Sequence, residues 1–186
     1  MTRISFFAKR WASRFASDQS GNVAIEATII LPIMFWAYLS MFSIFDAYRQ
    51  YTVSQKAAYT ISDLISRQTT PIDDAFMDSS RALFEMLTRS IDEPSMRLTI
   101  VKYNEADNSY TVQWSEVRGS FGALVDENIE NWHDRLPVMP DQENVIVLET
   151  QSQYDPPFDT GLENRTIKNF VFTRPRYAPQ VLWQNG

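Results

Sequence analysis

The sequence predicts an α+β fold in which a long N-terminal membrane-spanning helix is followed by a small antiparallel sheet packed on helices. Three observations support this expectation. Residues 23–45 form an apolar run that carries one charged side chain. An apolar stripe with helical spacing continues from there to about Arg67. Further along, four segments rich in β-branched and aromatic residues are separated by polar or proline-containing connections, as in a small sheet.

The first predicted element is one helix over residues 22–67 that includes a transmembrane span at 23–45. The span measures roughly 34 Å at 1.5 Å per residue, enough to cross a hydrocarbon core of about 30 Å. Pro32 lies inside it and is tolerated as a kink, because neighbouring helices or water satisfy the carbonyl that it frees. Glu26 is the one residue of the run that a plain anchor helix does not explain. Small and hydroxylated side chains allow another helix to approach closely: Ala24, Ala27, Thr28, Ala37, Ser40 and Ser43.

The charges predict an orientation. Residues 1–22 carry four basic side chains and one acidic one, a charge of +3, so the remainder carries −9 of the total −6. The positive-inside rule then places the N-terminus in the cytoplasm and the domain after the span outside. The acidic exterior argues against nucleic acid as a partner, since that needs a basic surface. The absence of cysteine excludes disulfides and thiolate metal sites.

Residues 1–21 have the pattern of a basic leader, but not of an ordinary signal peptide. The small residue, Gly21, precedes the apolar run, whereas signal peptidase needs small residues after it. Removal at Gly21 would strip the leader on the cytoplasmic side and leave the span attached to the domain. An apolar stripe in the leader suits a helix on a membrane surface, while a disordered basic tail is the alternative: Ile4, Phe7, Trp11 and Phe15.

Residues 21–27 (GNVAIEA) and 29–32 (IILP) resemble the N-terminal region of TadE-like proteins, the minor pseudopilins of the bacterial tight-adherence (Tad, type IVc) pilus. The resemblance covers about 15 residues. It implies a pilin-like domain and a prepilin peptidase that cuts between Gly21 and Asn22, which makes Glu26 the fifth mature residue. Ala27 departs from the family pattern, in which phenylalanine or a similar residue usually follows the glutamate. Residues 172–178 also look similar to such proteins.

By this resemblance the chain is a single-pass protein of the bacterial inner membrane with a periplasmic domain, used in pilus assembly or adhesion. Its implied partners are inner-membrane lipid, the prepilin peptidase, other pilin or pseudopilin subunits and pilus platform proteins. Two alternatives stay open. One is an uncleaved, TadG-like, membrane-anchored accessory protein of a pilus or secretion assembly. The other is an exported binding domain with a ligand site on its sheet.

Glu26 and Pro32 are the candidate residues for subunit packing or register. Cleavage would create an ammonium at Asn22, one helical turn from the Glu26 carboxylate. In a filament, Glu26 could pair with the new N-terminus of a neighbouring subunit, because an isolated buried charge is costly and a paired one is tolerated. The alternative is that Glu26 snorkels to the cytoplasmic headgroups.

The domain is expected to occupy about residues 60–180, with an extended tail at 174–186. Thr70 as N-cap and Pro71 at the first helical position predict a second helix to about Ser90. Its inward side chains would be Phe76, Leu83, Met86 and Leu87. A third amphipathic helix is expected over residues 124–136. Strands are predicted over residues 96–103, 110–117, 144–150 and 167–173.

No catalytic residue, cofactor or metal site is expected. His133 is the only histidine and falls on a polar surface position of the third predicted helix. Neighbouring acids suit helix starts and solvated loops better than catalysis: Asp73 with Asp74, Asp126 with Glu127, and Asp141 with Glu143. The polar segment 104–109 lacks the glycine and distal glutamate of an EF-hand. We therefore expect a structural protein rather than an enzyme.

Overall fold

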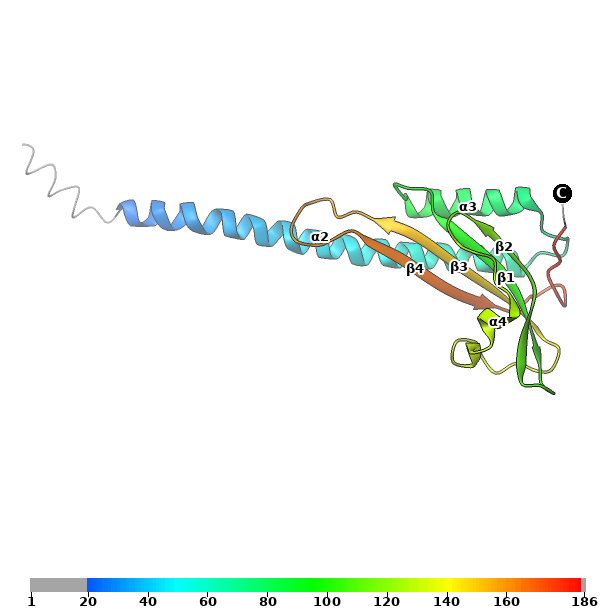
Figure 1. Ribbon diagram of the computed structural model, residues 1–186. Coiled ribbons are helices and arrows are strands. Elements are labelled where there is room, and N and C mark those ends of the chain that lie inside the picture. Colours follow the sequence, from blue (N-terminus) through cyan, green and yellow to red (C-terminus); the bar gives the residue numbers. More distant parts are fainter. Residues whose placement is uncertain (1–19, 185–186) are drawn as a thin grey trace, which may run out of the picture. The chain divides into compact units, whose positions relative to one another are not determined.

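The computed structural model describes residues 20–184, and the side chains of residues 23–184, so the predicted leader falls largely outside it. The predicted α+β class is confirmed, with a long apolar N-terminal helix and a four-stranded antiparallel sheet (Figure 1). The elements in chain order are α2 (Ser20–Ser66), α3 (Asp74–Thr88), β1 (Ser95–Asn104), β2 (Ser109–Arg118), α4 (Asp126–Ile129), the 3₁₀ turn η1 (Trp132–Asp134), β3 (Asn144–Tyr154) and β4 (Arg165–Thr173).

The chain forms two compact units. The first contains the chain up to Ile44 together with residues 158–162, and the second contains residues 45–157 and 163–186. In the first unit, Phe158 from the β3–β4 connection packs edge-on against Phe42 of α2, with ring centroids 5.8 Å apart. The second unit holds the sheet, the remaining helices and the last part of α2.

The sheet has the strand order β2-β1-β3-β4, and all three pairings are antiparallel. The four strands begin and end within four residues of their predicted bounds. Successive side chains of a strand point to opposite faces, so in β3 Ile146 and Leu148 reach one core and Val145 and Val147 the other. Between β1 and β2, Ile100 pairs with Trp114 and Val101 with Val112, so Gln113 is the extra residue of a β-bulge.

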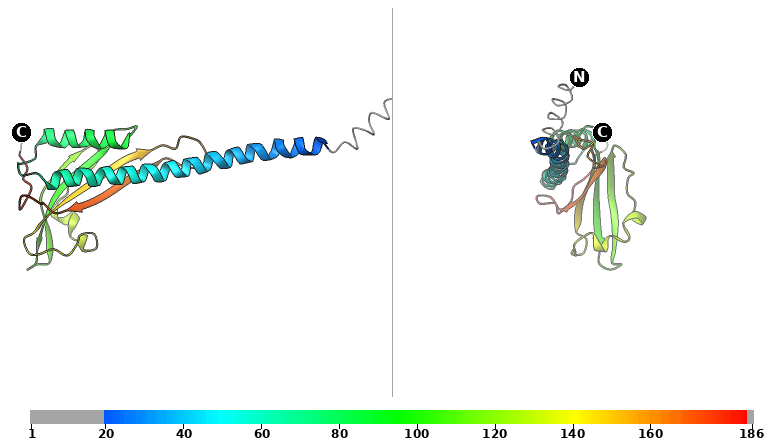
Figure 2. Two further views of the ribbon diagram at one scale, coloured as in Figure 1. Left: turned by 180° about the vertical axis from the view of Figure 1, so that it is seen from behind. Right: turned by 90° about the vertical axis from the view of Figure 1, so that its left-hand side faces the viewer.

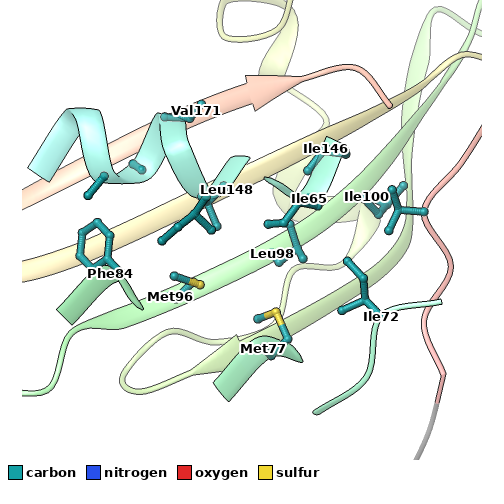
Figure 3. Close-up of a cluster of buried hydrophobic side chains, with 14 residues drawn as sticks. Ile65, Ile72, Met77, Phe84, Met96, Leu98, Ile100, Ile146, Leu148 and Val171 are labelled. Atoms are coloured by element: carbon teal, nitrogen blue, oxygen red, sulfur yellow. The ribbon is translucent and has the colours of Figure 1, made fainter. Parts of the chain in front are cut away.

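The first hydrophobic core lies between one face of the sheet and the helices α2 and α3 (Figure 2). From the sheet, Leu98 and Leu148 face each other across the β1–β3 pair and are fully buried. From α2, Ile61 and Ile65 are fully buried against them. Figure 3 shows these side chains together with others of the core: Ile72, Met77, Phe84, Met96, Ile100, Ile146 and Val171.

The second core lies on the opposite face of the sheet and corrects one prediction. The expected helix over residues 124–136 is wrong, since the structure has only the four-residue α4 and the turn η1 there. Its apolar side chains, Ile129, Trp132 and Leu136, are nevertheless buried against β1, β2 and β3. The segment is rich in Asn and Asp, whose side chains compete for backbone partners and favour turns over helix.

The predicted start of the second helix is also wrong. Helix α3 begins at Asp74, and Asp73 is its N-cap, accepting a 2.8 Å hydrogen bond from the backbone N–H of Phe76. Residues 71–73 cannot be helical because Ile72 pairs with the C-terminal tail, accepting from Gln184 at 2.9 Å and donating to Leu182 at 2.8 Å. Met86 and Leu87, expected to point inward, are exposed, whereas Phe84 is buried.

The C-terminal tail, predicted to be extended, bends at residues 176–180 and packs against the rest of the second unit. Val181 is buried, and its carbonyl accepts a 2.9 Å hydrogen bond from the indole N–H of Trp114. The centroids of the Trp114 and Trp183 rings lie 5.6 Å apart. The backbone N–H of Arg176 donates to the carbonyl of Ser66 at 2.8 Å, at the end of α2. The tail thus closes the end of the core at which α2 terminates.

Candidate functional site

The N-terminal half of α2 is the most unusual surface of the protein. Among the described residues, α2 is the one helix long and apolar enough to cross a membrane. Its large apolar side chains are about half to two-thirds exposed, for example 64% for Leu31 and 65% for Phe35. Such a continuous apolar surface is unfavourable in water and indicates contact with lipid or with other apolar helices.

The hydroxyl groups in this segment are satisfied within the helix itself. Thr28 Oγ1 donates to the carbonyl of Ala24 at 2.7 Å, and Ser40 Oγ donates to the carbonyl of Trp36 at 2.9 Å. A hydroxyl bonded to its own helix can enter hydrocarbon without a partner, since little polar surface remains to be solvated.

Pro32 lies within α2, which continues without a break on both sides. Proline has no backbone N–H, so the carbonyl of Thr28, four residues earlier, lacks its usual intrahelical donor. The side chain of Pro32 is exposed. The site therefore offers an acceptor to a neighbouring helix, which is consistent with the predicted packing role.

Glu26 is exposed, and within the described residues it forms no hydrogen bond or ion pair. Gly21 and Asn22 lie within α2, and the side chain of Asn22 falls outside the described set. Asn22 and Glu26 are four residues apart in one helix, so they share a helical face. The structure thus brings together the predicted cleavage position and the carboxylate, while leaving the carboxylate without a partner among the described residues.

Beyond the apolar run, three polar contacts fasten α2 to the rest of the second unit. The Tyr154 hydroxyl lies 3.1 Å from Asp46 Oδ2 and donates to it. Gln50 Nε2 donates to the carbonyl of Thr88 at 2.6 Å, and Asn169 Nδ2 donates to Ser54 Oγ at 2.8 Å. Burial, together with the hydrogen bond to Asp46, raises the pKa of Tyr154 to about 12. The sequence analysis did not predict these contacts. The one indication in the sequence is that Asp46, Gln50 and Ser54 place polar side chains at four-residue spacing along α2.

A buried ionic cluster lies on the face of the sheet away from α2. Glu149 Oε2 accepts a 2.7 Å hydrogen bond from Arg97 Nε and lies 2.5 Å from Arg97 Nη2, and both side chains are less than 15% exposed. Arg135 Nη2 lies 3.8 Å from the other carboxylate oxygen. The Arg135 guanidinium also stacks on Phe170, at 3.9 Å from the ring centroid. The cluster ties β1, β3 and the segment after α4 together.

The residues considered for catalysis have structural partners. His133 is exposed and packs against the Tyr110 ring, with ring centroids 4.9 Å apart. Asp74 pairs with Arg118 at 2.5 Å, and Asp126 Oδ1 accepts from the backbone N–H of Val112 at 2.6 Å. Asp141 Oδ1 accepts from the backbone N–H of Glu105, which lowers the pKa of that carboxyl. Within residues 20–184, no group of three or more His, Asp or Glu side chains is arranged to hold a metal ion.

Comparisons with family models, with curated proteins and with solved structures give no match. The resemblance of residues 21–32 to TadE-like proteins therefore stays a prediction based on that motif.

Proposed function

We propose that this protein is a minor pseudopilin of a bacterial Tad-type pilus. In this proposal α2 inserts in the inner membrane, the N-terminus is cytoplasmic, and the sheet domain is periplasmic. A prepilin peptidase cuts between Gly21 and Asn22, and the mature subunit takes part in pilus assembly or adhesion. The observation that carries the proposal is the exposed apolar half of α2 with one unpartnered carboxylate among the described residues, Glu26, on a helix that continues into a small α+β domain.

The chemistry of Glu26 explains how a carboxylate within an apolar helix could contribute to subunit packing. An isolated carboxylate in hydrocarbon costs several kcal/mol. Cleavage after Gly21 supplies a cation, the new ammonium at Asn22. When apolar helices of neighbouring subunits pack together, pairing of Glu26 with that ammonium offsets much of the desolvation cost and selects one axial register. The apolar side chains around Glu26 then exchange lipid for protein contacts, at little cost in hydrophobic free energy.

The second candidate, an uncleaved TadG-like anchor, is favoured by a different observation. Gly21 and Asn22 both lie within helix α2, so the peptide bond between them is helical. Proteases act on exposed, locally unfolded chain, and a helical bond must first fray. In this alternative the leader stays attached, and Glu26 lies among the cytoplasmic headgroups.

N-terminal sequencing of the protein isolated from membranes of cells with an active prepilin peptidase separates the two candidates. We expect a mature chain that begins at Asn22, and loss of this product in Gly21→Ala. The matched control is Gly122→Ala, because a Cβ added at Gly122 meets no atom within 4 Å. The control should be processed like the wild type. A chain that keeps Met1 in these cells would refute the pseudopilin proposal and favour the uncleaved anchor.

A further inference from the structure

The C-terminal end of α3 presents three large apolar side chains that the core does not use. Met86 is 69% exposed, Leu87 38% and Ile91 73%. The core contacts of this region are made instead by Phe84 and Thr88, which are buried. Helix α3 ends at Thr88, and its C-cap Arg89 adopts a left-handed conformation with φ 51° and ψ 40°. We call residues 86–91 the α3 tip.

The α3 tip lies beside the part of α2 that directly follows the apolar run. The contact that fixes it is the hydrogen bond from Gln50 Nε2 to the carbonyl of Thr88, 2.6 Å long. Gln50 comes five residues after Phe45, or about 7.5 Å along the helix axis. The start of α3 follows the end of α2, so within this unit the two helices run antiparallel and the α3 tip lies at the end of α3 nearer to Phe45 (Figure 1).

We propose that the α3 tip docks on the surface of the membrane that α2 spans, with Met86, Leu87 and Ile91 in the boundary between headgroups and acyl chains. This inference rests on the proposed function, since it requires α2 to be a membrane span. Each headgroup layer is about 5–8 Å thick. If the hydrocarbon core ends near Phe45, Gln50 lies close to the outer edge of this layer. Side chains of the α3 tip that point toward Phe45 along the helix axis therefore enter the headgroup layer. Apolar side chains at this depth exchange water for lipid.

The charges near the α3 tip favour apolar insertion over electrostatic adsorption. Arg49 and Arg89 are exposed cations, and Asp92 is an exposed acid. Glu85 is half-buried, and Glu93 pairs with Arg81 at 2.8 Å. Because these charges nearly cancel, docking should persist at high salt, unlike the binding of a polybasic surface.

The protein contains no cysteine, which permits single nitroxide labels without background. Three variants of the full chain, reconstituted in vesicles of phosphatidylethanolamine and phosphatidylglycerol, test the proposal. Ile91→Cys reports the α3 tip, and Phe35→Cys reports the span. The control is Val138→Cys, since Val138 is 96% exposed on the connection before β3. Power saturation compares collision of each label with oxygen, which enters lipid, and with a water-soluble nickel chelate.

We expect the ratio of oxygen to nickel accessibility at residue 91 to exceed that at residue 138 several-fold and to fall below that at residue 35. Equal ratios at 91 and 138, with residue 35 in lipid, would overturn docking of the α3 tip and leave the span standing. Water-like ratios at all three positions would overturn both. A high ratio at 91 that disappears when the protein is diluted in excess lipid would show a second copy as the partner, and would overturn the lipid assignment.

Discussion

Replacing Glu149 by Gln tests whether the ionic cluster on the sheet stabilises the domain. The substitution keeps the shape of the side chain and removes its charge. Arg97, whose side chain is 14% exposed, then loses the carboxylate with which it forms an ion pair and a hydrogen bond through Nε. The second cation of the cluster, Arg135, is 45% exposed and can turn toward water. The effect of the change therefore falls on one buried guanidinium.

Removing one partner of a buried pair typically costs 3–5 kcal/mol, because the remaining charge stays buried. The amide introduced by Glu149→Gln still accepts a neutral hydrogen bond from Arg97, so we expect the lower end, a loss of about 3 kcal/mol. For a chain of this size each kcal/mol lowers the melting temperature by about 2–4 °C, which predicts a decrease of about 6–12 °C. Thermal unfolding of the full chain in detergent micelles, followed by near-ultraviolet circular dichroism, measures this directly.

The matched control is Glu93→Gln, which removes the carboxylate partner of Arg81. Glu93 is 75% exposed, so its loss should cost less than about 1 kcal/mol. If both variants melt within a degree or two of each other, the reasoning from burial is wrong. A third variant combines Arg97→Met with Glu149→Leu. It should recover most of the lost stability, because replacing both ions by apolar groups removes the unpaired charge.

Two further predictions concern α2. The pKa of Tyr154 is about 12 in the folded protein, above its ordinary value of 10.0, so folding favours the neutral phenol. The contribution of Tyr154 to stability is therefore complete below pH 10 and is lost as the pH rises toward 12. The free energy of unfolding should therefore fall between pH 9 and pH 12 by up to about 2–3 kcal/mol more in the wild type than in Tyr154→Phe, and equal slopes would contradict this. Glu26→Gln should insert in membranes like the wild type but co-purify with other pilus subunits at least tenfold less, a loss of about 1.4 kcal/mol or more in association. Thr28→Val, which removes a hydroxyl bonded within its own helix, is the control and should leave co-purification unchanged; equal recovery of both variants would argue against pairing of Glu26.

The sheet and the long helix were predictable because their patterns are local. A short run of β-branched and apolar residues, such as Val145 to Leu148, predicts a strand that is buried on both faces, whatever lies against it. The prediction of a helix over residues 124–136 was wrong because Ile129 and Trp132 can be buried against the sheet from short turns as well as from a helix. Helix α3 starts later than predicted because Ile72 pairs with the C-terminal tail. A contact between residues so far apart in the sequence leaves no local pattern from which to predict it.

Some features of the candidate site were predictable from the sequence and others were not. Glu26 and Pro32 stand out in the sequence because each is rare within an apolar run. The contacts of Asp46, Gln50 and Ser54 depend instead on β3, α3 and β4, which lie more than 35 residues away along the chain. The exposure of the α3 tip was not predictable either. The helical periodicity predicted that Met86 points inward, whereas in the structure Met77 and Phe84 are the buried side chains and Met86 is exposed.

Two carboxylates near the ends of the apolar run, Glu26 inside its start and Asp46 directly after its end, connect the alternative roles of Glu26. Glu26 and Asp46 are separated by twenty residues of continuous helix, or about 30 Å, which is the thickness of a hydrocarbon core. Asp46 accepts a hydrogen bond from Tyr154 of β3, so the residue that directly follows the candidate span is tied to the sheet. A helix placed with Asp46 at one boundary has Glu26 at the other, where the carboxylate reaches the headgroups at little cost. If the protein joins a filament as proposed, the helix would leave the membrane and Glu26 would lie among packed apolar helices. Pairing with the ammonium of a neighbouring subunit would then be favourable. Under the proposed function, snorkelling and pairing would be successive states of Glu26, before and after assembly.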